Sequence, residues 1–428
     1  MRGRPGTRAL PLLGGGRAVG GPIPLGLFAS YVAVALVGWL AAAVALVLAA
    51  PAIANRHPLD ETPVLAVHLV ALVLLPLAVT AASFHLLPVM LRNDIRHPRL
   101  LRAALPLLAG GLLVAPGIAF DQATVLWPGV ALVTGGLAIV LFELLGLVLR
   151  APRDRTLIAS RAGVALVCLH VTAAFVLGGV VFEHGDATVA GVTHDRWLLV
   201  HLHLAVLGWI TLLIVTVGRT LGPMLALAPA APARRLPVTE VTVSLGLWVL
   251  LLGIAASWNW VAAVGALVIL IGIADFARQM IRVVRTRRLP LEAPLAHLVC
   301  GVAFLAQAAV LAALLLGSWV EPQRVLTAYV VLLLAGWGAG VTLGHLGKLL
   351  SLSIWVWWPP GPRPKQEALY PRGVWLAEAL AFAVGIEAIA CGSLAGSTWL
   401  VRGGAVAVTA AALLAVSGAA RTWHARPR

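Results

Sequence analysis

Twelve long apolar runs constrain the fold of this chain more than any other feature of its sequence. A membrane-crossing α-helix needs about 20 apolar residues in succession, and these runs lack the strict alternation of a membrane β-strand. The sequence therefore predicts an all-α, polytopic membrane protein with twelve transmembrane helices. The runs lie near residues 24–52, 63–91, 101–120, 123–149, 160–183, 196–226, 239–257, 260–283, 293–318, 324–352, 374–396 and 399–420.

The composition supports a membrane protein and excludes an ordinary soluble domain. Hydrophobic residues make up 61% of the chain and charged residues 11%, whereas about a quarter of the residues of a soluble domain are charged. We expect a single membrane domain over residues 1–428, with the lipid bilayer as its surroundings. A flexible basic N-terminus would cover 1–23, the helix bundle 24–420 and a basic tail 421–428.

The basic residues predict an orientation. The formal net charge is +15, which would suggest nucleic acid as a partner of a soluble protein. In membrane proteins, Lys and Arg instead gather in the cytoplasmic loops. With a cytoplasmic N-terminus, only four of the 31 basic residues fall in outer loops: Arg56, Arg196, Arg324 and Arg402. We therefore expect both termini in the cytoplasm, a location in the inner membrane, and no nucleic-acid partner.

Three of the long runs end alike, which indicates an internal repeat. "HLLPVML" begins at His85, "RTLGPML" at Arg219 and "HLGKLL" at His345, at intervals of 134 and 126 residues. Self-similarity at a fixed interval is the mark of repeated structural units. We expect three pseudo-symmetric four-helix arcs, in which the runs 63–91, 196–226 and 324–352 occupy matching positions.

Three histidines are predicted to share one depth near the outer side of the membrane: His68, His201 and His203. His201 and His203 are two residues apart on one helix, so their rings point about 200° apart and reach different neighbouring helices. Imidazole is a usual ligand of haem iron and copper in helical bundles. We therefore expect these three residues to ligate a metal.

A second level of polar residues is predicted near the inner side. His85, Arg219 and His345 occupy matching places at the ends of their runs. They are candidate cofactor-binding residues, and in a haem protein the arginine would pair with a propionate.

Two of these runs resemble helices of a known family. "HLVALVLLPLAVTAASFHLLPVMLRNDIRHPRL" is similar to the second helix of haem-copper oxidase subunit I, and "HLHLAVLGWITLLIV" resembles the sixth helix of its cbb3-type branch. The resemblance implies twelve helices in three arcs, with haem b and copper as cofactors. It also implies that His68 is a low-spin haem ligand and that His201 or His203 is a copper ligand. Respiratory-chain subunits, or a cytochrome or cupredoxin electron donor, would be the partners.

The sequence also departs from that family. The run 239–257 lacks the copper-binding His pair, the run 324–352 lacks the outer-side His-x-His, and the run 196–226 has no tyrosine. Glu143 and Glu387 are the acids deepest in the runs, and neither matches a proton-channel position of the family. These departures argue against a terminal oxidase or nitric oxide reductase of the standard type. The leading hypothesis is a haem- or copper-binding membrane protein for electron transfer or for binding nitric oxide or oxygen.

Two alternatives belong to other functional classes. One is a membrane transporter, or a metal- or haem-handling protein without redox turnover, that uses the histidines at both faces as entry and exit points. The other is an accessory subunit that retains the scaffold without its chemistry. An optical spectrum and the copper content of the purified protein would distinguish the three hypotheses.

Overall fold

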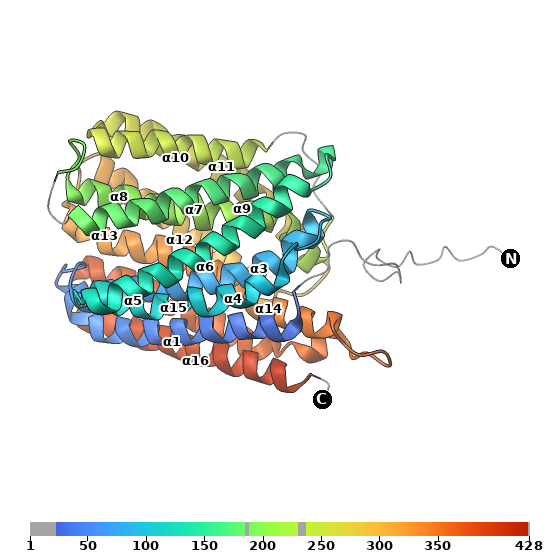
Figure 1. Ribbon diagram of the computed structural model, residues 1–428. Coiled ribbons are helices and arrows are strands. Elements are labelled where there is room, and N and C mark those ends of the chain that lie inside the picture. Colours follow the sequence, from blue (N-terminus) through green and yellow to red (C-terminus); the bar gives the residue numbers. More distant parts are fainter. Residues whose placement is uncertain (1–22, 185–187, 230–236, 427–428) are drawn as a thin grey trace.

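Twelve helical spans run side by side through the computed structural model, which describes residues 23–184, 188–229 and 237–426 (Figure 1). Each is long and apolar enough to cross a membrane, so the predicted multi-pass, all-α class is confirmed. Apart from one isolated bridge between Val189 and Val192, the regular elements of the described residues are helices. Spans made of one long α-helix are α1 (Leu25–Ala54), α6 (Ala123–Arg150), α7 (Ile158–His184), α10 (Val238–Ala256), α11 (Asn259–Thr286), α12 (Ala293–Leu316), α15 (Arg372–Ala395) and α16 (Thr398–His424).

The third span differs from its prediction as one helix over 101–120. It consists of α4 (Pro98–Leu108) and α5 (Gly111–Ala119), separated by a turn. A Cβ atom on Gly111 would lie 2.2 Å from the backbone oxygen of Leu72, so only glycine permits this approach to the second span. The break thus coincides with a close backbone contact between helices.

The ends of the chain extend the last span. The last helix continues to His424, four residues into the segment predicted as a basic tail. Of the predicted N-terminal segment 1–23, residues 1–22 lie outside the described part of the chain. The described chain begins and ends at the same end of the bundle (Figure 1).

The second, sixth and tenth spans each contain a π-helical segment between two α-helices. A π-helical turn is wider than an α-helical one, is rare, and occurs frequently at functional sites. The second span comprises α2 (Glu61–Leu69), η2 (Val70–Leu74) and α3 (Leu75–Met90). The sixth comprises α8 (His194–His203), η4 (Leu204–Thr211) and α9 (Leu212–Ala226), and the tenth α13 (Pro322–Val330), η5 (Val331–Ala339) and α14 (Gly340–Val356).

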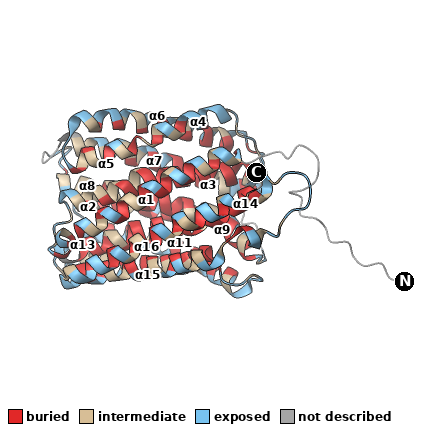
Figure 2. Ribbon diagram, turned by 90° about the horizontal axis from the view of Figure 1, so that it is seen from below, coloured by how far each residue is buried: buried red, intermediate tan, exposed pale blue. Residues whose placement is uncertain are grey.

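These three composite spans form the centre of the bundle. In the most apolar stretch of the tenth span, 83% of the residues are buried. The corresponding share is 61% in the second and sixth spans and 28% in α12. The segment η5 contacts both η2 and η4. Figure 2 shows the buried residues on the faces that the helices turn toward one another, and the exposed residues on the outer faces. Large apolar side chains cover those outer faces, as expected for contact with lipid: Leu149, Val176, Trp260 and Leu267 are examples.

A hydrogen-bonded pair joins two of the π-helical segments. The indole N–H of Trp337 in η5 donates to Oγ1 of Thr211 in η4 at 2.8 Å. That hydroxyl donates in turn to the backbone oxygen of Val206, five residues earlier, at 2.9 Å. The pair therefore fixes the wide turn of the sixth span against the tenth.

Candidate functional site

The six candidate residues from the sequence all lie on the three central spans. His68 is on α2 and His85 on α3, His201 and His203 are on α8, Arg219 is on α9, and His345 is on α14. The end of the bundle at which α2, α8 and α13 begin is called the His68 end here. The opposite end, at which α3, α9 and α14 terminate, is the His345 end. Figures 1 and 2 show the α8 and α13 labels toward one end and the α3 and α14 labels toward the other.

His68 and His201 form a pair with the same hydrogen-bonding pattern. Nδ1 of His68 lies 2.8 Å from the backbone oxygen of Val64, and Nδ1 of His201 lies 2.9 Å from that of Ala174 on α7. A carbonyl oxygen only accepts, so each Nδ1 carries the proton and each Nε2 keeps an unprotonated lone pair. Neither Nε2 has a hydrogen-bond partner among the described residues. The two rings are close enough for the charge of one to act on the other.

Both rings are partly accessible, since each residue retains an intermediate exposure. A Cβ atom on Gly178 of α7 would lie 2.9 Å from Cε1 of His201, so the absence of a side chain at Gly178 makes room for this ring.

His203 is separated from this pair. Its Nδ1 donates to the backbone oxygen of Leu199 at 2.7 Å, and its Nε2 accepts a hydrogen bond from the hydroxyl of Tyr329 on α13 at 2.8 Å. His201 and His203 thus reach different helices, as the spacing predicts. Tyr329 was not among the predicted site residues, because no local pattern connects it with a histidine 126 residues away.

The three outer histidines do not form a three-ligand site in this structure. Among the described residues, no group of three or more His, Cys, Asp or Glu side chains is arranged to hold a metal ion. Both ring nitrogens of His203 are engaged in hydrogen bonds. Of these three histidines, the ring nitrogens that remain able to ligate a metal are therefore Nε2 of His68 and Nε2 of His201.

His345 borders a cavity at the opposite end. Its Nδ1 donates to the backbone oxygen of Val341 at 2.7 Å, and the described residues offer its Nε2 no hydrogen-bond partner. The cavity has a volume of about 80 Å³ and lies between the second, sixth, ninth and tenth spans. Small and apolar residues line much of it, among them Ala82, Ser83, Gly218, Gly222 and Leu298.

The other two predicted inner residues do not join His345 at this cavity. His85 packs against the ring of Phe28, and its ring nitrogens lie 3.3 and 3.4 Å from Oγ of Ser353. Arg219 forms an ion pair with Glu240 on α10, at 2.6 and 2.9 Å to the two carboxylate oxygens. A role of Arg219 toward a propionate stays a prediction, and a propionate would have to share this guanidinium with Glu240.

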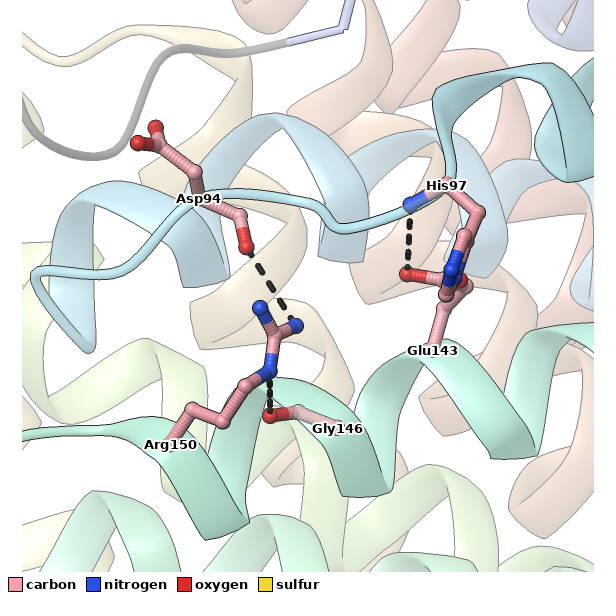
Figure 3. Close-up of polar contacts among 5 residues, drawn as sticks. All are labelled: Asp94, His97, Glu143, Gly146 and Arg150. Carbon is pink, nitrogen blue, oxygen red and sulfur yellow. Dashed lines mark hydrogen bonds and ion pairs between the residues drawn. The ribbon is translucent and has the colours of Figure 1, made fainter.

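Buried carboxylates with basic partners are the main feature that the sequence missed. Glu143 on α6 accepts from Nδ1 of His97 at 2.7 Å and from its backbone N–H at 3.4 Å (Figure 3). Arg150 contacts the backbone oxygen of Asp94 in the same loop (Figure 3). These contacts fasten the loop between the second and third spans to α6. Comparable pairs join His297 to Glu378 and Lys348 to Glu292.

No protein-family model matches the chain, and no curated protein matches it. The functional argument therefore rests on the side chains of this protein alone.

Proposed function

We propose that this protein binds b-type haem within the membrane, with His68 and His201 as the axial ligands. The observation that carries the proposal is the pair of unpartnered Nε2 lone pairs on two of the central spans, both on partly accessible imidazoles. Because each Nδ1–H is held by a backbone carbonyl, the tautomer needed for iron ligation is fixed in advance. Both termini would lie in the cytoplasm, with the protein in the inner membrane.

The donor set fits haem and does not fit a three-imidazole copper site. Imidazole is a usual ligand of haem iron, and the two unpartnered Nε2 atoms of His68 and His201 could hold one. A histidine-based copper centre with three ligands would need His203 as well, and that side chain is bound to Leu199 and Tyr329. Copper is therefore not part of the proposal.

Two histidine ligands favour electron transfer over gas binding. When bound, such a haem would supply one-electron transfer, with both imidazoles engaged in holding it. The part of the protein is to hold two neutral imidazoles in place and to surround them with apolar helices that exclude water. A cytochrome or a cupredoxin is the expected electron donor.

The repeated structure of the central spans supports the oxidase-like scaffold in this proposal. The π-helical segments begin at Val70, Leu204 and Val331, at intervals of 134 and 127 residues. His170 on α7 and His297 on α12 are likewise 127 residues apart. Each packs against a glycine of the following span, His170 against Gly208 and His297 against Gly344. We attribute this to three four-helix units arranged as pseudo-symmetric arcs.

A pyridine-haemochrome spectrum of the purified protein tests the proposal. Wild-type protein from haem-supplemented cells should contain haem b, and His68→Ala and His201→Ala should each lose it. His203→Ala is the matched control, because this residue lies two positions from His201 but has both nitrogens engaged. Wild-type protein without a Soret band, or variants of His68 and His201 with full haem content, would refute the assignment.

The cavity at the His345 end favours one alternative, a haem-handling protein without redox turnover. Its apolar lining and the unpartnered Nε2 of His345 favour transient binding of an apolar ring. If His345→Ala, and not His68→Ala, reduces the haem content, this alternative replaces the proposed one.

A further inference from the structure

A second group of buried polar side chains lies at the His345 end, apart from the proposed haem ligands. Glu378 on α15 is fully buried, and its Oε2 lies 2.7 Å from Nε2 of His297 on α12, which is also buried. The other carboxylate oxygen, Oε1, has no hydrogen-bond partner. A buried carboxylate oxygen without a donor is costly, so its surroundings must explain it.

Two further buried polar atoms without partners belong to the same neighbourhood. They are the hydroxyl of Tyr370 and the indole nitrogen of Trp375. Trp375 precedes Glu378 by three residues on α15, so the two side chains share one face of the helix. The Tyr370 ring stacks parallel to the Trp375 ring at 6.4 Å between centroids. These two atoms and Oε1 of Glu378 therefore belong to α15 and the residues directly before it.

The chemistry of these atoms is that of a water site. The indole nitrogen donates, the hydroxyl donates or accepts, and the free carboxylate oxygen accepts. Burial raises the pKa of Tyr370, and the carboxylates of Glu292 and Glu378 raise it further, so the hydroxyl keeps its proton. The backbone N–H of Ala293 lies near the hydroxyl oxygen of Tyr370, but the two do not have the geometry of a hydrogen bond. Buried waters typically bind two to four such groups.

Several charged groups lie near this carboxylate. Lys348 and Glu292 form an ion pair at 2.9 Å, and the ammonium of Lys348 also lies 4.8 Å from the centre of the Tyr370 ring. The charge of Arg372 acts on Tyr370, and His345 interacts electrostatically with His297. Because Nε2 of His297 donates to Oε2 of Glu378, Oε1 is the carboxylate oxygen that remains open to a proton.

We propose that Glu378 and His297 form a hydrated proton-binding site, whose proton is exchanged through water held by Tyr370 and Trp375. A proton arriving on that water binds Oε1 of Glu378, while the His297 N–H remains hydrogen-bonded to Oε2. It leaves by the reverse step. Beyond His297 lies His345, whose side chain lines the cavity, so the site stands between the loop at Tyr370 and that cavity. None of these residues is a proposed haem ligand, and the site does not depend on haem.

Infrared difference spectroscopy of the full-length protein in lipid nanodiscs, recorded across pH in H₂O and D₂O, tests this site. The wild-type protein should show a carboxylic-acid C=O band that disappears as pH rises and shifts to lower frequency in D₂O. Glu378→Gln should abolish the band. Glu387→Gln is the matched control, because Glu387 lies on the same helix and receives a hydrogen bond from the neutral Gln307 amide at 3.2 Å. This control should retain the band.

Other variants keep the test decisive if Glu378→Gln does not fold. In wild-type protein labelled with ¹³C-glutamate, the band should shift with the label. His297→Gln keeps an N–H donor but removes the imidazole, and should move the pH at which the band disappears. A band that persists in Glu378→Gln, that is absent from the wild type at every pH, or that ignores D₂O would overturn the proposal. The haem content is a separate measurement and has no bearing on this result.

Discussion

Tyr329 donates a hydrogen bond to Nε2 of His203 at 2.8 Å, which joins the tenth span to the sixth near the His68 end. The same imidazole donates from Nδ1 to Leu199. The Nδ1 bond lies within α8, so the Nε2 bond to Tyr329 is the one that holds α8 to α13. The sequence groups His203 with His68 and His201, whereas its contacts assign it a different task.

Tyr329→Phe should destabilise the protein without changing its haem content. Removing the hydroxyl leaves a buried imidazole nitrogen without a donor, which costs about 1–3 kcal/mol. Unfolding in detergent, followed by circular dichroism, measures the loss, and the haemochrome spectrum measures haem. A marked loss of haem in this variant would instead return His203 to the set of ligands.

Thr211→Val should loosen the contact between the two π-helical segments. The substitution keeps the shape of the side chain but leaves the buried Trp337 N–H without an acceptor, at a cost of about 1–3 kcal/mol. Thr134→Val is the control, since Thr134 is exposed on α6 and bonds only within its own helix, to Val130. Equal unfolding midpoints for the two variants would show that the Trp337–Thr211 bond contributes nothing.

The sequence predicts the spans well because each depends on local composition. The boundaries of α6 and α12 agree with the prediction to within two residues, since a charged or proline-rich turn ends each apolar run. The π-helical segments could not be predicted in this way. Leu-rich stretches such as Val331–Ala339 show no local pattern that separates a π-helical turn from an α-helical one, and tertiary contacts decide between them.

The candidate site could be predicted only in part, because its contacts join distant segments. The sequence indicated His68 and His201 as histidines of one depth, and the structure gives both the same hydrogen-bonding pattern. It did not indicate Glu378, whose partner His297 lies 81 residues earlier. The acids that it did single out, Glu143 and Glu387, are bound to His97 and Gln307. The position of a residue within an apolar run predicts its depth in the membrane. Its hydrogen-bond partners depend on how the helices pack, which the sequence does not show.

Glu240→Gln should destabilise the protein strongly. Glu240 is 1% exposed and Arg219 13% exposed, so the substitution leaves a largely buried guanidinium without its counter-charge. Breaking one partner of a buried ion pair costs about 3–5 kcal/mol. The unfolding free energy in detergent measures the effect.

The surface pair of Arg92 and Asp154 provides the comparison for that variant. Hydrogen bonds from Thr156 lower the pKa of Asp154, and Arg92 lowers it further. The stabilisation from this carboxylate is therefore present above its ordinary pKa and is lost as pH falls through the lowered one. Because the pair is exposed and screened by solvent, Asp154→Asn should lower stability at neutral pH only slightly. Equal losses for Asp154→Asn and Glu240→Gln would contradict the role assigned to burial.

Tyr370→Phe distinguishes a hydrated Glu378 site from a dry one. If water bridges the hydroxyl to Trp375 and Glu378, removing the hydroxyl breaks a bond worth about 1 kcal/mol and lowers stability. If the site is dry, the variant removes an unsatisfied polar group and is neutral or more stable than the wild type. Thermal unfolding gives the sign of the change.

Gly178→Ala and Gly179→Ala, two adjacent substitutions on α7, test the position of the His201 ring most directly. A Cβ atom on Gly178 would lie 2.9 Å from Cε1 and 3.3 Å from Nδ1 of His201, whereas one on Gly179 would have no neighbour within 4 Å. Both variants make the same chemical change in the same helix, so their effects on helix propensity are alike. Because Nδ1 of His201 is held by Ala174 on α7, the added methyl at Gly178 must push the ring away from that oxygen and turn Nε2. Gly178→Ala should therefore lower the haem content or shift the Soret band, and Gly179→Ala should retain the wild-type spectrum. Identical spectra for the two variants and the wild type would show that His201 does not hold the haem.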